Sequence, residues 1–185
     1  MKLFWPVLSG VLCTAHISFA EPRVTYNSYG MPGLVDMPSA QSAPDAELSF
    51  SVSQSGESLR NTLTFQIAPR LTGAFRYSSI ERSQGTLYDR SFDLRYRLLD
   101  ETHLRPAVAV GLQDFIGTGV YSGEYVAASK SFGPVVATAG IGWGRLGSHN
   151  SFDNPLGVIS SRFDTRDAGY TGTGGRIESA RWFRG

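Results

Sequence analysis

Apolar and polar side chains alternate with a period of two in seven stretches of the chain. Successive side chains of a β-strand point to opposite faces of a sheet, so each stretch predicts a strand with one apolar and one polar face. Turn residues separate the stretches, which indicates an antiparallel meander and excludes an all-helical protein. The predicted strands are 47–54, 61–67, 71–78, 91–99, 104–112, 123–130 and 135–145.

The connections between these strands alternate between short turns and long loops. Short turns at one rim and long loops at the other, with aromatic residues flanking the apolar faces, are typical of an outer-membrane barrel. We therefore predict an all-β fold, an antiparallel meander that forms part of a transmembrane outer-membrane β-barrel. A soluble β-sandwich shares the period of two and is the alternative. The short connections are 68–70, 100–103 and 131–134, and the long ones are 79–90, 113–120 and 146 onward.

The first twenty residues have the pattern of a secretory signal peptide. Lys2 precedes an apolar run, and Ser18 and Ala20 supply the small residues of a cleavage site. We predict cleavage after Ala20 and a location in the outer membrane of a Gram-negative cell. Lipidation of Cys13 is the alternative, but Leu12 stands where a lipoprotein signal has Gly, Ala or Ser.

Loss of the signal restricts the chemistry of the mature chain. Cys13 is the only cysteine, so the mature chain has no disulfide, thiolate metal site or catalytic cysteine. The whole chain has a formal net charge of +1, whereas a nucleic-acid-binding protein carries a large basic excess. His103 has no metal-ligating neighbour at a useful spacing. We predict no metal, no cofactor and no nucleic-acid partner.

The pattern divides the chain into four parts. The part that follows the signal peptide contains Pro32-Gly33, a type II turn signal, which requires a positive φ at Gly33. The parts are a signal peptide (1–20), an N-terminal extended and turn segment (21–46), the barrel strands (47–145) and a long loop region leading to a missing strand (146–185).

Residue types that form the active site of a hydrolase occur together after the last predicted strand. Outer-membrane acyl hydrolases place a His and a Ser on a barrel strand, whereas here Ser148, His149 and Ser151 follow Gly147 in a loop. We predict that the chain is not an enzyme. Two alternative functions stay open, namely a lipid-modifying hydrolase using His149 with Ser151 or Ser148, and a soluble secreted carbohydrate-binding β-sandwich.

Several blocks of sequence carry a family resemblance that runs from about Tyr29 to the end. They are SYGMPGLVDMPSA, LYDRSFDLRYRLLDE, PAVAVGLQDFIGTGVYSGEYVAASK, VVATAGIGWGRLG and FDNPLG. In combination they resemble the YjbH family of exopolysaccharide-associated outer-membrane proteins. The resemblance implies an outer-membrane β-barrel involved in the production or export of an extracellular polysaccharide, with no known enzyme activity. The partners we predict are outer-membrane lipid, an anionic exopolysaccharide and other polysaccharide-export proteins.

The chain departs from that family in length, because family members are several times longer. Seven strands are an odd number, whereas bacterial single-chain barrels close with an even number. The C-terminal residues Arg181 to Gly185 also lack a strand with a final aromatic residue. These features predict an N-terminal piece of a longer barrel.

Charged residues gather on the polar face of three neighbouring predicted strands. Arginine can bind a carboxylate through two parallel hydrogen bonds, and many exopolysaccharides are acidic. We therefore predict a polysaccharide-facing stripe inside the barrel. The alternative is that the arginines pair with acidic groups on strands beyond this piece of the barrel and hold its interior together. The stripe consists of Arg76, Asp93, Arg95, Arg97 and Arg105.

Overall fold

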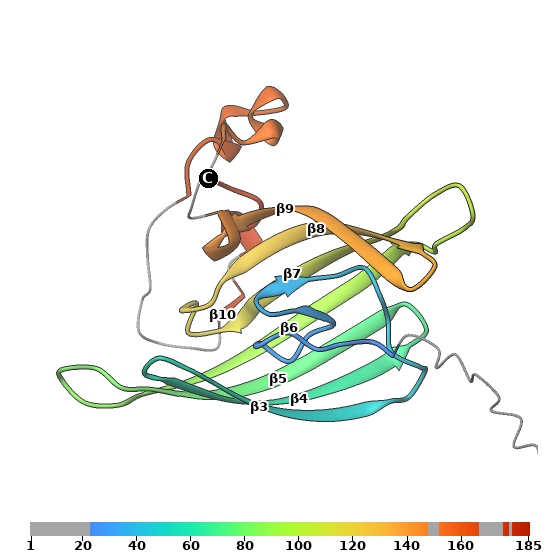
Figure 1. The fold of residues 1–185 in the computed structure, drawn as a ribbon. Coiled ribbons are helices and arrows are strands. Elements are labelled where there is room, and N and C mark those ends of the chain that lie inside the picture. Colours follow the sequence, from blue (N-terminus) through green and yellow to red (C-terminus); the bar gives the residue numbers. More distant parts are fainter. Residues whose placement is uncertain (1–22, 148–151, 167–175, 178) are drawn as a thin grey trace, which may run out of the picture.

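The computed structural model describes residues 23–147, 152–166, 176–177 and 179–185. Seven antiparallel strands form one curled sheet with the shape of a half-barrel (Figure 1), and strands adjacent in sequence are adjacent in the sheet. No α-helix occurs among the described residues. The seven strands are β3 (Leu48–Ser55), β4 (Ser58–Ala68), β5 (Leu71–Ile80), β6 (Leu87–Leu99), β7 (Ala107–Gly117), β8 (Gly123–Phe132) and β9 (Val135–Gly144).

These seven strands confirm the predicted meander, with differences at the strand ends. β4 begins at Ser58, three residues before the predicted start, because Ser58 already pairs with Ser55 across a two-residue turn. β7 begins at Ala107 instead of 104, directly after Pro106, which has no N–H to donate to a ladder. Leu104 and Arg105 consequently lie in the turn between β6 and β7.

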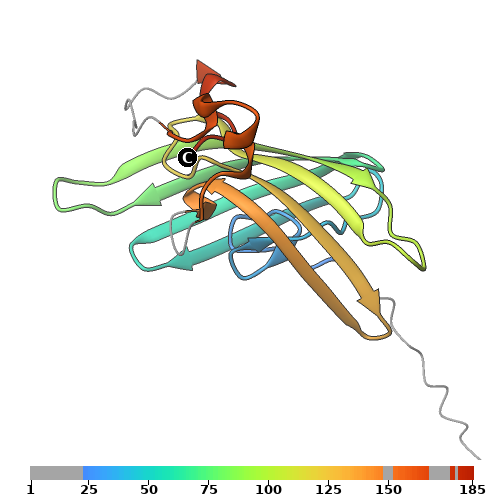
Figure 2. The ribbon, with the colours of Figure 1, turned by 90° about the horizontal axis from the view of Figure 1, so that it is seen from above.

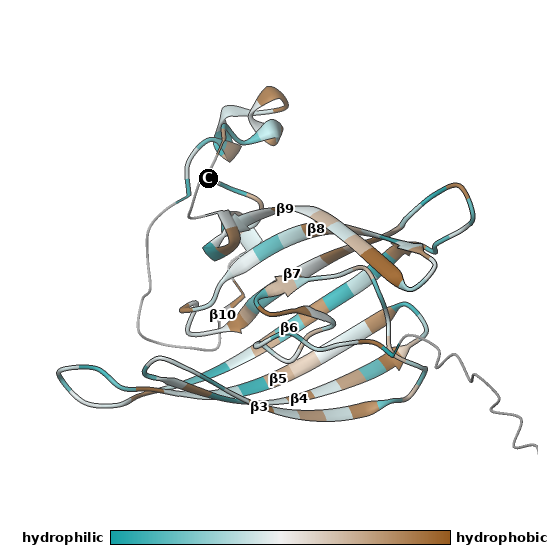
Figure 3. Ribbon diagram, viewed as in Figure 1, coloured by the Kyte–Doolittle hydropathy of each residue, from teal (hydrophilic) through white to brown (hydrophobic). Residues whose placement is uncertain are grey.

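The two faces of the sheet have opposite character, and the alternation is visible along the strands in Figure 3. The convex face carries large apolar side chains that are exposed, such as Phe50, Leu63 and Phe92. The concave face carries polar side chains that are buried, and Arg76 and Arg95 are among the largest fully buried side chains of the protein. This distribution is the reverse of that in a soluble protein, where large apolar side chains fill the interior.

The N-terminal segment, residues 24–46, covers the concave face (Figures 1 and 2). It contains a small hairpin of β1 (Gly33–Leu34) and β2 (Met37–Pro38). The predicted type II turn at Pro32-Gly33 is wrong, because positive φ angles occur at Gly30 and Val35 and not at Gly33. Gly33 is needed for another reason, since a Cβ atom there would lie 2.1 Å from the carbonyl oxygen of Met37.

The part after β9 packs against the loop-side ends of β8 and β9. Arg166 forms an ion pair with the buried Glu124 of β8 at 2.7 Å, and the backbone N–H of Phe183 donates to the same carboxylate. The Trp143 ring of β9 meets the Phe183 ring edge to face, with centroids 5.1 Å apart. This part contains the 3-10 helices η1 (Arg145–Gly147), η2 (Pro155–Val158), η3 (Ser161–Phe163) and η4 (Ser179–Arg181), and β10 (Arg176–Ile177), which pairs with β7.

The predicted signal peptide, residues 1–20, lies outside the described residues. In the part of the chain that the structure describes, no helix is long and apolar enough to cross a membrane.

Candidate functional site

The candidate site is the concave face of β4, β5 and β6 together with the N-terminal segment that lies on it. The alternation predicted from the sequence brings Arg76, Asp93 and Arg95 to this face, where all three are buried. Arg60, Gln66 and Asp89 are also buried on this face, and the other buried neighbours are small or hydroxyl-bearing. These neighbours are Thr62, Thr64, Thr72, Ala74, Ser78 and Ser91.

Arg76 and Asp93 form a buried ion pair between β5 and β6. Two parallel hydrogen bonds of 2.9 Å join the guanidinium to both carboxylate oxygens. Arg76 Nη1 also donates to the backbone carbonyl of Tyr29 at 2.9 Å, and Asp93 Oδ1 accepts the backbone N–H of Asp114. The pair therefore links the sheet to the N-terminal segment, and it gives Arg76 an acidic partner within the chain itself, not on a further strand.

Tyr29 is the main aromatic anchor of the N-terminal segment. The guanidinium carbons of Arg60, Arg76 and Arg145 lie 4.5, 5.1 and 4.1 Å from the centre of its ring. The ring of Tyr121 meets it edge to face, with centroids 5.4 Å apart. Stacking of arginines on a desolvated aromatic ring contributes about 1 to 2 kcal/mol per contact. Tyr29 thus fixes the segment against β4 and β5.

Backbone contacts complete the attachment of this part of the segment. Thr64 donates to the carbonyl of Gly30 at 2.6 Å. Gly30 has a φ of +77°, and a Cβ atom there would lie 2.5 Å from the Thr62 side chain, so only glycine fits. Tyr26 contacts Glu47, the residue directly before β3. Partial burial raises the pKa of the Tyr26 phenol, which therefore stays protonated and donates a hydrogen bond to Glu47 at 2.8 Å.

Arg95 contacts the second half of the N-terminal segment. Its Nη1 donates to the carbonyl of Ser39 at 2.9 Å, and its Nη2 donates to Ser42 Oγ at 2.8 Å. The backbone N–H of Ala40 donates to Ser129 Oγ of β8 at 2.9 Å. Residues 39–42 are therefore held mainly by polar contacts, together with the packing of the buried Ala40 against Ala107 and Ala109 of β7.

The remaining two members of the predicted stripe lie elsewhere. Arg97 sits at the turn-side rim, where it forms an ion pair with Asp100 at 3.0 Å and donates to the carbonyl of Pro69. Arg105 is exposed in the turn before β7, so its predicted place on the polar face is wrong. The structure thus brings together three of the five predicted residues. Whether any of them faces a polysaccharide stays a prediction.

The sequence prediction missed the group around Tyr29. Arg60 lies one residue before the predicted strand 61–67, but it has the phase of Thr62 and Thr64, so extending the alternation by one residue would have placed it on the polar face. Tyr121 lies in a loop without a periodic signal, and Arg145 ends the predicted strand 135–145 but begins η1 in the structure. Nothing in the sequence indicated that they would meet Tyr29.

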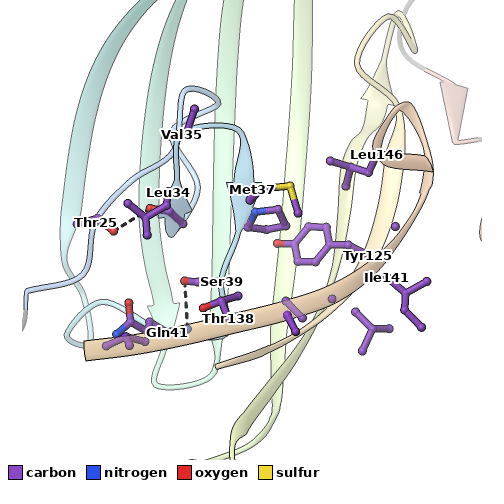
Figure 4. Close-up of a pocket in the computed structure, with 18 of the residues that line it drawn as sticks. Thr25, Leu34, Val35, Met37, Ser39, Gln41, Tyr125, Thr138, Ile141 and Leu146 are labelled. Carbon is purple, nitrogen blue, oxygen red and sulfur yellow. Dashed lines mark hydrogen bonds between the residues drawn. The ribbon is translucent and has the colours of Figure 1, made fainter. Parts of the chain in front are cut away.

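A cavity of about 630 Å³ lies between the β1–β2 hairpin and the inner sides of β8 and β9 (Figure 4). Its lining is mainly apolar and includes Leu34, Met37 and Tyr125. Among its described lining residues, only Arg23 and Tyr125 have ionisable side chains. Such a cavity can hold an apolar group, but it offers no pair of side chains suited to acid–base or nucleophilic chemistry.

Metal binding and hydrolysis would each need a particular set of side chains close together. Among the described residues, no group of three or more His, Cys, Asp or Glu side chains is placed to hold a metal ion. The residues of the alternative hydrolase site, Ser148, His149 and Ser151, lie outside the described residues.

Comparison with known proteins agrees with the resemblance seen in the sequence. A model of the YjbH family, described as "Exopolysaccharide biosynthesis protein YbjH", matches residues 25–185. A protein of Escherichia coli (strain K12), named "Uncharacterized lipoprotein YjbH", is 36% identical over 169 residues, which cover 86% of this chain and 24% of the relative. The chain therefore spans about a quarter of the length of that relative. No solved structure matches the chain significantly. The family match and this identity together show that the chain belongs to the YjbH family of exopolysaccharide biosynthesis proteins.

Proposed function

We propose that this chain forms part of the wall of an outer-membrane β-barrel that takes part in the production or export of an extracellular polysaccharide. The placement in a membrane rests on one observation, namely that the polar face of the sheet is buried and its apolar face is exposed. Its buried face is polar, and its exposed face presents rows of Leu, Phe, Val and Ile. Lipid can cover such an apolar face, whereas water would leave it unfavourably hydrated.

The strand lengths and the outer aromatic residues support the same placement. β4 to β9 contain 10 to 13 residues each, close to the roughly 9 to 11 needed to cross a membrane as a tilted strand. Tyr77 and Tyr88 stack on the convex face near the long-loop rim, and Tyr96 lies nearer the other rim. Tyrosines at both interfaces are typical of membrane barrels. A soluble sandwich would need a second sheet over the convex face.

The role in exopolysaccharide production rests on the family, and the proposed role is not catalytic. The concave face presents hydrogen-bond donors and one ion pair but no nucleophile with an adjacent base. The alternative of a lipid-modifying hydrolase makes a distinct prediction. Lipid hydrolysis by the purified chain that disappears in His149→Ala would contradict the non-catalytic role.

The proposal is tested by fractionation together with polysaccharide measurement. In a Gram-negative host that carries the gene, we expect the chain in the outer-membrane fraction after alkaline washing. We expect deletion of the gene to lower surface polysaccharide, and expression of the gene from a plasmid to restore it. Recovery of the chain in the soluble periplasmic fraction would favour the secreted sandwich, and unchanged polysaccharide after deletion would contradict the role in its production.

The N-terminus provides a separate test of how the chain reaches the envelope. The E. coli relative is called a lipoprotein. For this chain we propose cleavage after Ala20, because Leu12 precedes Cys13. Intact-mass measurement of the mature protein should therefore give an unmodified N-terminal Glu21. A mass corresponding to an acylated N-terminal Cys13 would overturn this processing.

A further inference from the structure

Arg95 differs from Arg76 in having no acidic partner. Both guanidinium groups are fully buried, but Arg76 is neutralised by Asp93, whereas none of the ion pairs among the described residues includes Arg95. Arg95 donates only to neutral oxygens, those of Ser39, Ser42 and, at 3.4 Å, Thr72. Its Nε–H is buried without a hydrogen-bond partner. A buried charge without a counter-charge is unfavourable, so this position is suited to an anion.

The N-terminal segment occupies the donors that an anion would use. Nη1 and Nη2 of Arg95 both donate to residues 39–42, which provide one carbonyl and one hydroxyl oxygen as acceptors. A carboxylate accepts two parallel hydrogen bonds from arginine, and such charge-assisted bonds are roughly twice as strong as bonds to neutral acceptors. A carboxylate and residues 39–42 therefore compete for the same atoms.

Residues 39–42 are also the part of the segment that can leave most easily. Four hydrogen bonds hold them, namely two from Arg95, one from the Ala40 N–H to Ser129 and one from the Ser39 N–H to the Pro32 carbonyl. Ala40 is their only apolar side chain and packs against Ala107 and Ala109, so they bury little apolar surface, and local opening has a low free energy where few apolar contacts exist. Tyr29, in contrast, is anchored by three arginines and Tyr121, so the hairpin stays in place while residues 39–42 lift.

We propose that Arg95 is a subsite for the carboxylate of an acidic saccharide, and that residues 39–42 fill this subsite when no saccharide is bound. The proposal rests on the role in exopolysaccharide production stated above and adds a ligand class and an occluding segment to it. Saccharide binding and docking of residues 39–42 exclude each other. A polymer that enters must displace the segment, and an empty site closes again. The exposed Arg105 has no part in this subsite.

The experiment measures the binding of a saccharide and the displacement of residues 39–42 in the same protein. The full chain carries Cys13→Ser, so that it has no cysteine of its own, and is purified in detergent. Oligomers of galacturonic acid are the probe, and neutral maltose oligomers of the same length are the control. Ala43→Cys reports displacement, because Ala43 is buried beside residues 39–42 and reacts with a maleimide only after opening. We expect the acidic probe to raise the labelling rate at least threefold and the neutral control to leave it unchanged.

Variants separate the subsite from general electrostatic attraction. We expect Arg95→Gln to weaken binding of the acidic probe at least tenfold and to abolish its effect on labelling, and Arg105→Gln to change neither. Ser42→Ala removes one contact of the segment and should strengthen binding. Circular dichroism and the heat-dependent gel shift check folding, and Arg95→Lys, which keeps the charge, should bind between wild type and Arg95→Gln if the glutamine variant misfolds.

Three outcomes overturn the proposal. Equal binding by wild type and Arg95→Gln would remove the subsite, as would absence of binding in every variant including Ser42→Ala. Binding without any change in the labelling of Ala43→Cys would show that the segment and the saccharide fit together. None of these outcomes affects fractionation or surface polysaccharide, so a failure of this inference is distinguishable from a failure of the proposed function.

Discussion

Leu63→Arg should sharply reduce the amount of folded protein in the outer membrane. Leu63 lies midway along β4 on the convex face, 44% exposed and paired with Phe50 and Phe75 of the neighbouring strands. An arginine at the midplane of a membrane barrel costs about 2 to 4 kcal/mol. The measurement is the fraction of heat-modifiable protein in purified outer membranes.

The matched control is Leu104→Arg. Leu104 is more exposed, at 91%, but it lies in the turn between β6 and β7, where an arginine stays in water. This variant should accumulate like wild type. If both variants accumulate normally, the convex face does not contact lipid, and a soluble protein that covers this face in another way becomes the better description.

Asp93→Ala should destabilise the fold by about 3 to 5 kcal/mol. The substitution leaves the Arg76 guanidinium buried without its counter-charge, and it removes the acceptor of the Asp114 backbone N–H. The measurement is urea unfolding of the purified chain in detergent, followed by tryptophan fluorescence. The double variant Arg76→Met/Asp93→Leu should recover much of the loss, because it removes both charges.

Asp100→Ala provides the comparison for the ion pair. Asp100 pairs with Arg70 and Arg97 at the turn-side rim, where its side chain is 41% exposed. Exposed pairs contribute about 0 to 1 kcal/mol, so this variant should unfold almost as wild type does. Similar losses for Asp93→Ala and Asp100→Ala would contradict the view that the buried pair fastens the sheet to the N-terminal segment.

The sequence was sufficient to predict the seven strands and the face of the sheet on which their side chains lie. Phe92 and Tyr96 on one side and Asp93 and Arg95 on the other follow from a period of two, which leaves no freedom once the strand forms. Proline explains the difference at the start of β7, because Pro106 delays this strand and leaves Arg105 in the turn.

The partners of the inward side chains could not be predicted in the same way. Arg76 and Arg95 donate to the backbone carbonyls of Tyr29 and Ser39, and every residue of a chain carries such an acceptor. A carbonyl therefore leaves no signature in the sequence. The place of the N-terminal segment depends on curvature of the sheet and on contacts between residues far apart in the chain, which periodicity does not contain.

The hydrogen bond from Ala40 to Ser129 has a consequence for the order in which the molecule assembles. Its two residues are 89 positions apart, so it cannot form until β4 to β8 have been added to the sheet. Contacts of such long sequence separation form slowly, because the entropy of closing the loop is lost before the contact is gained. Residues 39–42, which are synthesised before all seven strands, therefore become fixed only after β8 is in place. In pulsed hydrogen exchange during refolding, the amide of Ala40 should gain protection after the amides of the β4–β5 hairpin.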